Sequence, residues 1–202
     1  MTAPAQAAFV SPVTVGLVAP GGIASDPTPI NETASVDPAL GLHAGDAGNQ
    51  ISSFWMLPNE SITFSGNAIL LHLVAGADDG NGVFTTGYLG AGGNNARYEF
   101  KGLQVAGQTI TGYSMAAPVG ISSGAELALI STSQLNFRLD SLVFDTTKAR
   151  DVNGYYYAEI RVDLLTQPTT QPPDNNVPEP AGWALVAAAL AALRLVPRRR
   201  AA

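Results

Sequence analysis

Short stretches in the middle of the chain alternate apolar and polar residues, which is the pattern of β-strands with one buried face. In YAEIRVDL (Tyr157–Leu164), the residues Ala, Ile, Val and Leu alternate with Glu, Arg and Asp. QLNFRLD (Gln134–Asp140) repeats this alternation, and the apolar positions then change parity, which predicts a β-bulge near Ser141. NAILLHLVAG (Asn67–Gly76) is apolar on both parities and predicts a central strand that is covered on both faces.

Further strands are predicted where short apolar or alternating runs lie between turn signals. These runs are Val13–Ala19, Ser53–Leu57, Val83–Leu89, Arg97–Lys101, Gln108–Tyr113 and Glu126–Thr132. The turn signals are DDGNG (Asp78–Gly82), GAGGNN (Gly90–Asn95) and DVNG (Asp151–Gly154), and the last predicts a hairpin turn. Many short strands at nearly regular spacing predict an all-β fold, a β-sandwich of the jelly-roll kind.

Composition divides the chain into four regions. Residues 1–50 are rich in Pro, Gly, Ala and Asp and predict a loop-rich segment with one strand. Within it, residues 21–50 are expected to form a long loop or to be partly disordered. Residues 51–165 are the predicted β-sandwich core. Residues 166–176 (TQPTTQPPDNN) predict an extended, disordered linker, and residues 177–202 form a tail.

The charge of the chain restricts its partners. Its 202 residues include 10 Lys and Arg and 16 Asp and Glu, which gives a net charge of −6. Residues 1–176 hold 6 of the basic and 15 of the acidic side chains, so their net charge is −9. A domain this acidic repels nucleic acid and anionic membrane surfaces. The chain has no cysteine, which excludes disulfides and cysteine-ligated metals.

Residue types that carry enzymatic chemistry are few, and we predict no catalytic residue. His43 lies in a Gly-rich stretch near Asp46, whereas His72 lies in the middle of a predicted strand as a sheet or core histidine. Neither histidine belongs to a zinc-binding pattern. The outward carboxylates Glu159 and Asp163 leave one alternative, the acid–base pair of a glycan-active hydrolase.

Asp78, Asp79 and Asn81 are the candidate metal ligands. Their side-chain oxygens suit a calcium ion, but the same residues in this order also suit a hairpin turn. We therefore predict no cofactor, with calcium as the alternative.

Trp55, Tyr155 and Tyr157 are the candidates for stacking against sugar rings. Phe54 and Trp55 form one aromatic cluster, and Tyr155–Tyr157 form the other. Packing in the core or at the edge of a strand is the alternative role for these side chains.

The tail has three parts in a fixed order. Val177, Pro178, Glu179 and Pro180 precede an apolar run, Ala181–Val196, which is interrupted only by Arg194. Its first 13 residues would span roughly 20 Å as a helix, less than the ~30 Å of a bilayer core, so the predicted transmembrane helix is short. Arg198, Arg199 and Arg200 follow and are expected to stay cytoplasmic, which places the acidic domain outside.

This tail resembles the PEP-CTERM sorting signal of Gram-negative, exopolysaccharide-producing bacteria. The resemblance covers Val177–Pro180, the apolar segment and the arginines, in their usual order and position. It implies recognition by exosortase, a membrane processing enzyme, near the Pro-Glu-Pro motif. It also implies export with an N-terminal signal peptide. Because residues 1–12 lack a basic and then apolar region but contain Ala5-Gln6-Ala7, we expect the natural start to lie upstream.

These observations together predict an exported, non-catalytic protein of the cell surface or extracellular matrix. The resemblance implies a transient stay in the inner membrane and association with exopolysaccharide or biofilm. A carbohydrate-binding β-sandwich module is the first alternative, and a glycan-active hydrolase is the second. The diversity of domains that carry such tails leaves the ligand of this β-domain open.

Overall fold

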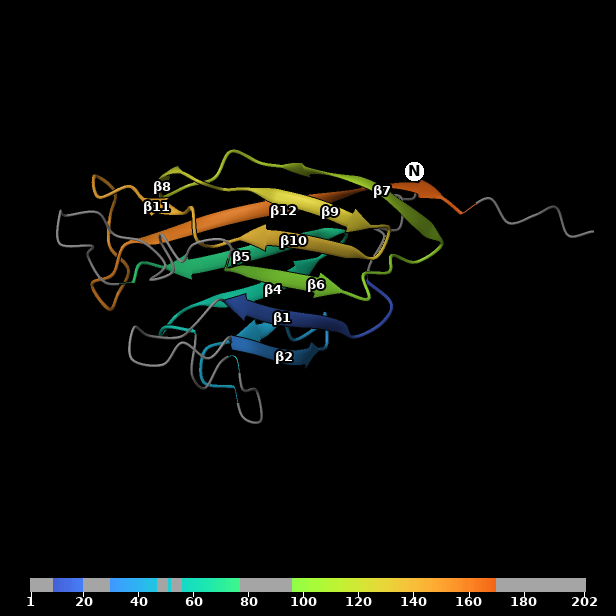
Figure 1. Cartoon of the computed structure of the whole chain (residues 1–202), viewed down its shortest axis with the longest axis horizontal. Helices are drawn as coiled ribbons and strands as arrows, with labels where there is room; N and C mark the ends of the chain where they lie inside the picture. Colours follow the sequence, from blue (N-terminus) through green and yellow to red (C-terminus); the bar gives the residue numbers. More distant parts are fainter. Residues whose placement is uncertain (1–8, 20–29, 47–50, 52–55, 77–95, 170–202) are drawn as a thin grey trace, which may run out of the picture. The chain divides into compact units, whose positions relative to one another are not determined.

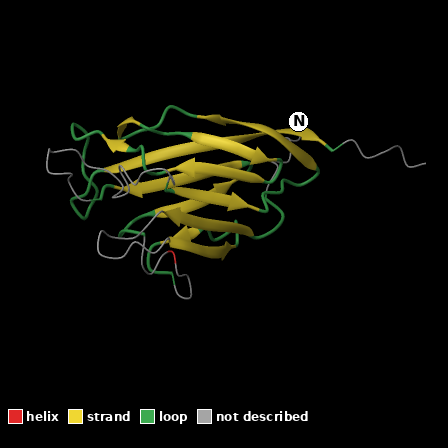
Figure 2. Ribbon diagram, viewed as in Figure 1, coloured by secondary structure: helices red, strands yellow, loops and turns green. Residues whose placement is uncertain are grey.

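The fold consists of β-strands in antiparallel sheets, as Figures 1 and 2 show. The structure is a computed structural model and describes residues 9–19, 30–46, 51, 56–76 and 96–169. The predicted all-β class is confirmed for these residues. Their strands are β1 (Val13–Ala19), β2 (Ile30–Val36), β3 (Leu42–His43), β4 (Ser61–Ser65), β5 (Ala68–Val74), β6 (Arg97–Lys101), β7 (Gln108–Met115), β8 (Ile121–Ser123), β9 (Leu127–Ser131), β10 (Gln134–Arg138), β11 (Val143–Phe144) and β12 (Tyr157–Pro168).

Most of these strands belong to two five-stranded sheets. The β1 sheet has the order β2-β1-β6-β10-β9, and the β5 sheet has the order β3-β4-β5-β12-β7. β8 and β11 form a separate two-stranded ribbon. All neighbouring strands are antiparallel, and the chain crosses repeatedly between the two larger sheets. Each sheet therefore combines strands from distant parts of the sequence.

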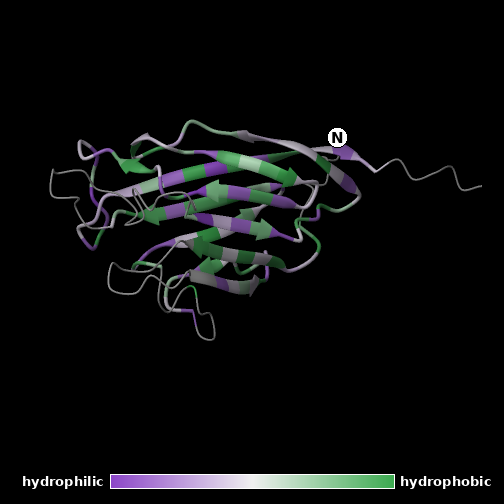
Figure 3. Ribbon diagram, viewed as in Figure 1, coloured by the Kyte–Doolittle hydropathy of each residue, from purple (hydrophilic) through white to green (hydrophobic). Residues whose placement is uncertain are grey.

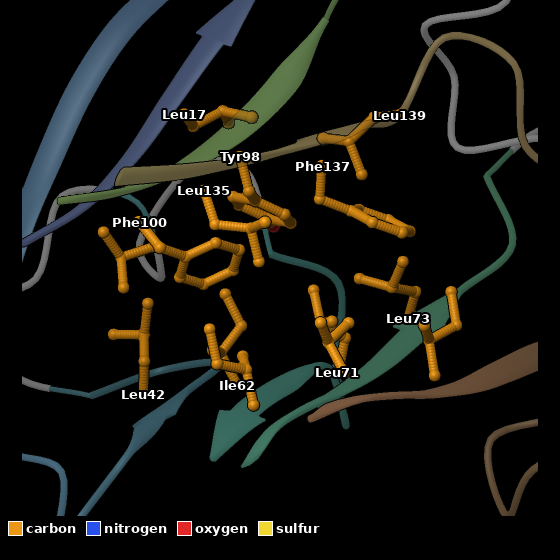
Figure 4. Packing of buried hydrophobic residues seen from close by; sticks show 14 of the residues in the cluster. Leu17, Leu42, Ile62, Leu71, Leu73, Tyr98, Phe100, Leu135, Phe137 and Leu139 are labelled. Atoms are coloured by element: carbon orange, nitrogen blue, oxygen red, sulfur yellow. The ribbon is translucent and has the colours of Figure 1, made fainter. Parts of the chain in front are cut away.

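The two sheets share one hydrophobic core. Phe100 and Phe137 of the β1 sheet are fully buried and point toward Ile62 and Leu71 of the β5 sheet (Figure 4). The alternation predicted for β12 is confirmed, because Ala158, Ile160, Val162 and Leu164 are at most 2% exposed whereas Glu159 and Arg161 are exposed. Figure 3 shows this alternation as bands along the strands. Burial of the inward faces of the central strands is what holds the two layers together.

Several predicted strands have the observed bounds or nearly so. β1 and β6 coincide with the predictions, and β7 begins at the predicted Gln108. β5 is the middle strand of its sheet, as predicted. Its outer face is less covered than expected, because Leu70 and His72 are half-buried there. The predicted turn at Asp151–Gly154 is also confirmed, with Gly154 N donating to Asp151 O at 3.0 Å and Gly154 at a φ of 84°.

The predicted β-bulge near Ser141 is wrong. The parity of the apolar residues changes because the chain turns at Leu139–Leu142, where Leu142 N donates to Leu139 O at 3.3 Å. The strand that follows, β11, pairs with β8 and no longer with β9. A change of parity in the sequence thus marks a change of pairing partner.

The expectation of a loop over residues 21–50 is wrong for two segments. Ile30–Val36 is a full edge strand, and Leu42–His43 is a short one. Among the β2 side chains that the structure describes, Ala34 and Val36 are the buried ones, and Glu32 interrupts the apolar pattern on their face. At the other end, β12 continues through Pro168 and thus runs into the predicted linker, since Thr169 N still donates to Gly107 O.

Two further predicted strands are only partly or not at all within the described residues. Met56 and Leu57 do not belong to a strand, and the rest of Ser53–Leu57 lies outside the described residues. Val83–Leu89 lies entirely outside them.

Candidate functional site

Many of the site residues predicted from the sequence lie outside the described residues. These are Trp55, the calcium candidates Asp78, Asp79 and Asn81, the motif Val177, Pro178, Glu179 and Pro180, the segment Ala181–Val196, and Arg198, Arg199 and Arg200. Their roles remain predictions.

Of the three candidate aromatic residues, Tyr155 and Tyr157 are described, and they lie in different settings. Tyr155 is 41% exposed and follows the turn, where its backbone N–H donates to Asp151 Oδ1 at 2.8 Å. Tyr157 begins β12 and is half-buried, and its ring stacks on the His72 ring with centroids 5.0 Å apart. One face of the Tyr157 ring is therefore already covered by an imidazole. The sequence indicated both tyrosines as candidates for sugar stacking, but it did not predict that Tyr157 stacks on His72.

His72 lies in a row of polar side chains across the outer face of the β5 sheet. The register places Ser61 of β4 and Glu159 of β12 directly beside it. His72 Nδ1 is 3.9 Å from Glu159 Oε1, and the two side chains are 27% and 62% exposed. The interpretation of His72 as a sheet histidine is confirmed. Its cross-strand neighbours are the carboxylate of Glu159 and the hydroxyl of Ser61.

The neighbouring row completes a shallow hollow, which we call the outer groove. Thr63, Leu70 and Arg161 are cross-strand neighbours there. The outer groove has a volume of about 380 Å³ and is closed on the third side by Ala116, Ala117 and Val119. This volume lies within the range of small-ligand sites, ~300–1,000 Å³.

The chemistry of the outer groove suits an uncharged polar ligand. Ser61, Thr63, His72 and Glu159 provide donors and acceptors, and Leu70 provides an apolar surface. Arg161 donates to both oxygens of Asp163 at 2.6–3.0 Å, and this hydrogen-bonded pairing raises the pKa of Arg161. Because the arginine is neutralised by its own neighbour, the described residues that line the groove offer no surplus positive charge for an anion.

Glu159 and Asp163 are the pair that the hydrolase alternative requires, and the two carboxylates have different partners, His72 and Arg161. They lie on the same face of β12 but four residues apart, which separates their Cα atoms by roughly 13 Å along an extended strand. Retaining and inverting glycosidases hold their two carboxyl groups at about 5–5.5 Å and 6.5–9.5 Å, and the hydrolase role of this pair stays a prediction. In addition, Arg161 lies between the two residues in sequence and binds Asp163.

His43 and Asp46 are close to each other, as expected from the sequence. His43 N donates to Asp46 Oδ2 at 2.7 Å, and His43 Nδ1 is 3.7 Å from the same oxygen. The aspartate therefore closes the turn that follows β3.

Glu60 is a buried carboxyl that the sequence did not reveal. It is only 7% exposed and accepts backbone hydrogen bonds from Leu57 N and Val74 N, both at 2.9 Å. Burial raises the pKa of Glu60 to about 7, and the two backbone donors only partly oppose this effect. In the sequence, Glu60 has the appearance of a surface residue next to a turn.

The described residues hold neither a candidate metal cluster nor a membrane-spanning helix. No three or more His, Asp and Glu side chains there gather into a potential metal site. The same residues contain no helix of the length and hydropathy needed to cross a bilayer.

Comparison of the chain with protein-family models, with curated proteins and with solved structures gives no match.

Proposed function

We propose that the protein is an exported, non-catalytic protein of the cell surface or extracellular matrix. The observation that carries this proposal is the order of the tail, in which Val177–Pro180, an apolar segment and three arginines follow one another. The net charge of −9 over residues 1–176 supports it, because an acidic domain stays hydrated within a polar matrix. The tail would act as the sorting signal and the β-domain as the functional part.

We also propose an architecture for the β-domain and the tail. The β-domain is a jelly-roll-like sandwich, followed by an extended linker and a short transmembrane helix over Ala181–Val196. The helix would hold the chain in the inner membrane while an exosortase-type enzyme processes the Pro-Glu-Pro motif. The processed domain would then associate with exopolysaccharide.

Sorting is tested by expressing the full chain behind an export signal peptide in a bacterium that has such an enzyme. In Glu179→Ala, we expect the protein to keep its tail and accumulate in the membrane fraction. The matched control is Asp174→Ala, which removes a nearby carboxylate outside the motif and should be processed as the parent chain is. Equal processing of both variants would contradict the role of the motif.

A carbohydrate-binding function is the second candidate, and the outer groove favours it. Sugars offer hydroxyl groups and an apolar ring face, and the groove combines Ser61, Thr63 and Glu159 with Leu70. A neutral polysaccharide fits better than an anionic one. Arg161 is paired with Asp163, so the Glu159 carboxylate would repel the anionic groups of the polymer.

The test of this second candidate is binding of polysaccharide from the producing bacterium. Glu159→Gln and His72→Ala should each weaken binding at least tenfold. The control is Glu126→Gln, since Glu126 is exposed, pairs with Arg138 and does not line the groove. Trp55→Ala separates the alternatives, because a loss of binding in that variant alone would place the glycan site at Trp55 instead.

A further inference from the structure

A second hollow, which we call the edge groove, runs along β2. It has a volume of about 680 Å³ and is lined by five consecutive residues, Thr33–Asp37, and by Leu40–His43 and Asp46. Successive residues of a strand point to opposite faces of its sheet. A hollow that touches every residue of such a stretch must therefore lie along the hydrogen-bonding edge of β2, and not on one face.

β2 is the outermost strand of the β1 sheet. Among the described residues it pairs with β1 only. Every second residue of an edge strand directs its N–H and C=O away from the sheet. The far wall of the groove contains β3, the edge of the other sheet, which is only two residues long. Backbone donors and acceptors of β2 thus face into the edge groove.

The edge of β2 is more regular than the other long edges, and the one opposing feature among its described side chains is Glu32, a charged residue of inward parity. Its register with β1 is continuous over seven pairs, without a bulge, and it contains no Pro, Lys or Arg. β7 is irregular, since the register shifts between Leu165 and Thr166. β9 also has a register shift, and Tyr113 Oη donates to Leu127 O on it at 2.8 Å.

The charges that line the edge groove are acidic. Among the described lining residues they belong to Asp37 and Asp46, beside which His43 lies, and none of these residues is Lys or Arg. Backbone donors hold both carboxylates in place, because Ala39 N donates to Asp37 Oδ1 at 2.9 Å and His43 N donates to Asp46 Oδ2 at 2.7 Å. A second copy of this chain, with its net charge of −6, is repelled at such a surface.

From these observations we infer that the edge groove binds an extended, basic segment of a partner polypeptide, which adds to β2 as a further antiparallel strand. Main-chain hydrogen bonds to β2 supply the binding, and Lys or Arg of the partner lies near Asp37 and Asp46. The inference is independent of the outer groove and goes beyond the proposed function, because it gives the protein a polypeptide partner.

The test uses the full chain and three blocked heptapeptides. The first alternates Lys and Val, the second has Glu in place of Lys, and the third is the first peptide with Pro at its centre. Titration calorimetry measures binding, and amide hydrogen exchange locates it. We expect the Lys peptide to bind and to slow exchange at alternate amides of β2 at least tenfold. The Glu and Pro peptides should bind at least tenfold more weakly.

Matched variants test the charge. The double variant Asp37→Asn, Asp46→Asn should weaken binding of the Lys peptide at least tenfold, since Asn keeps the capping oxygen but removes the charge. The control is Asp145→Asn, because Asp145 accepts from Thr147 N at 2.9 Å in a comparable turn away from the groove. Circular dichroism confirms that each variant is folded.

Four results would overturn the inference. The first is no binding of the Lys peptide, and the second is equal binding of the Lys, Glu and Pro peptides. The third is protection of β2 that appears without peptide and grows with protein concentration, which would identify a second copy as the occupant. Protection at β7 or β9 in place of β2 would place the binding site at another edge and contradict it as well.

Discussion

Glu60 predicts an unusual dependence of stability on pH. Its carboxyl is buried, and burial raises its pKa in the folded protein to about 7 from the ordinary value of 4.5. Below pH 4.5, the group is protonated in both the folded and the unfolded state. Between pH 4.5 and 7, the unfolded chain releases the proton while the folded chain keeps it, so folding becomes less favourable as pH rises.

The size of the effect follows from the two pKa values. A tenfold change in an ionisation constant is worth about 1.4 kcal/mol, so the free energy of unfolding should fall by about 3 kcal/mol from pH 4.5 to above pH 7. This is opposite in sign to the behaviour of a carboxylate in an ion pair, which stabilises the fold as pH rises. A loss of this size is large beside the ~5–15 kcal/mol that a domain has in total.

Glu60→Gln isolates this contribution, because Gln has no charge to titrate. The amide keeps one accepting oxygen but leaves Leu57 N or Val74 N without an acceptor, which costs about 1–3 kcal/mol at every pH. The assay is urea unfolding of both proteins in steps from pH 4.5 to 8. We expect the difference in free energy of unfolding between them to change by about 3 kcal/mol over this range.

The contributions of the other carboxyl groups to the pH dependence cancel in this difference, because both proteins contain them. Glu126→Gln serves as a control. Glu126 is exposed and forms a surface ion pair, so its replacement should change stability by less than about 1 kcal/mol. If the curves of the parent chain and Glu60→Gln run parallel from pH 4.5 to 8, the argument from burial is refuted.

Two further predictions concern packing and backbone conformation, each measured as a free energy of unfolding in urea. Gly124→Ala should destabilise by several kcal/mol, roughly 3 or more, because its φ is +94° and a Cβ would lie 1.7 Å from Ser141 O. Gly154→Ala should cost only about 1–2 kcal/mol, since it has a similar φ but open space, and equal costs would contradict this reasoning. Phe137→Ala should cost about 3–5 kcal/mol, whereas Val152→Ala, at a position 94% exposed, should cost almost nothing; a small loss at Phe137 would contradict its place in the core.

The sequence predicted those strands whose inward positions are strongly apolar. In β12, Ile160, Val162 and Leu164 separate clearly from the charged residues between them, so the strand and its buried face were both predictable. β2 was missed because Glu32 shares the inward parity with Ala34 and Val36. A carboxylate at that position breaks the alternation on which the prediction depends.

The outer groove could not be predicted from the sequence, because it depends on register. Alternation shows that His72 and Glu159 each lie on one face of a strand, but not that β5 pairs with β12. Ser61 joins the same row only because β4 pairs with β5 on the other side. The burial of Glu60 also depends on how the strands are arranged in space, since its donor Val74 N lies 14 residues away at the end of β5.

The intact mass and the C-terminal peptide of the protein recovered from the surface or medium of a producing bacterium test the central claim most directly. The proposed sorting predicts a mass that ends near Val177–Pro180, with Ala181–Ala202 removed. The β-domain and linker would then be the whole functional protein. A full-length mass that ends in Ala202, found in the inner-membrane fraction, would make the tail a permanent anchor and contradict the assignment to the matrix.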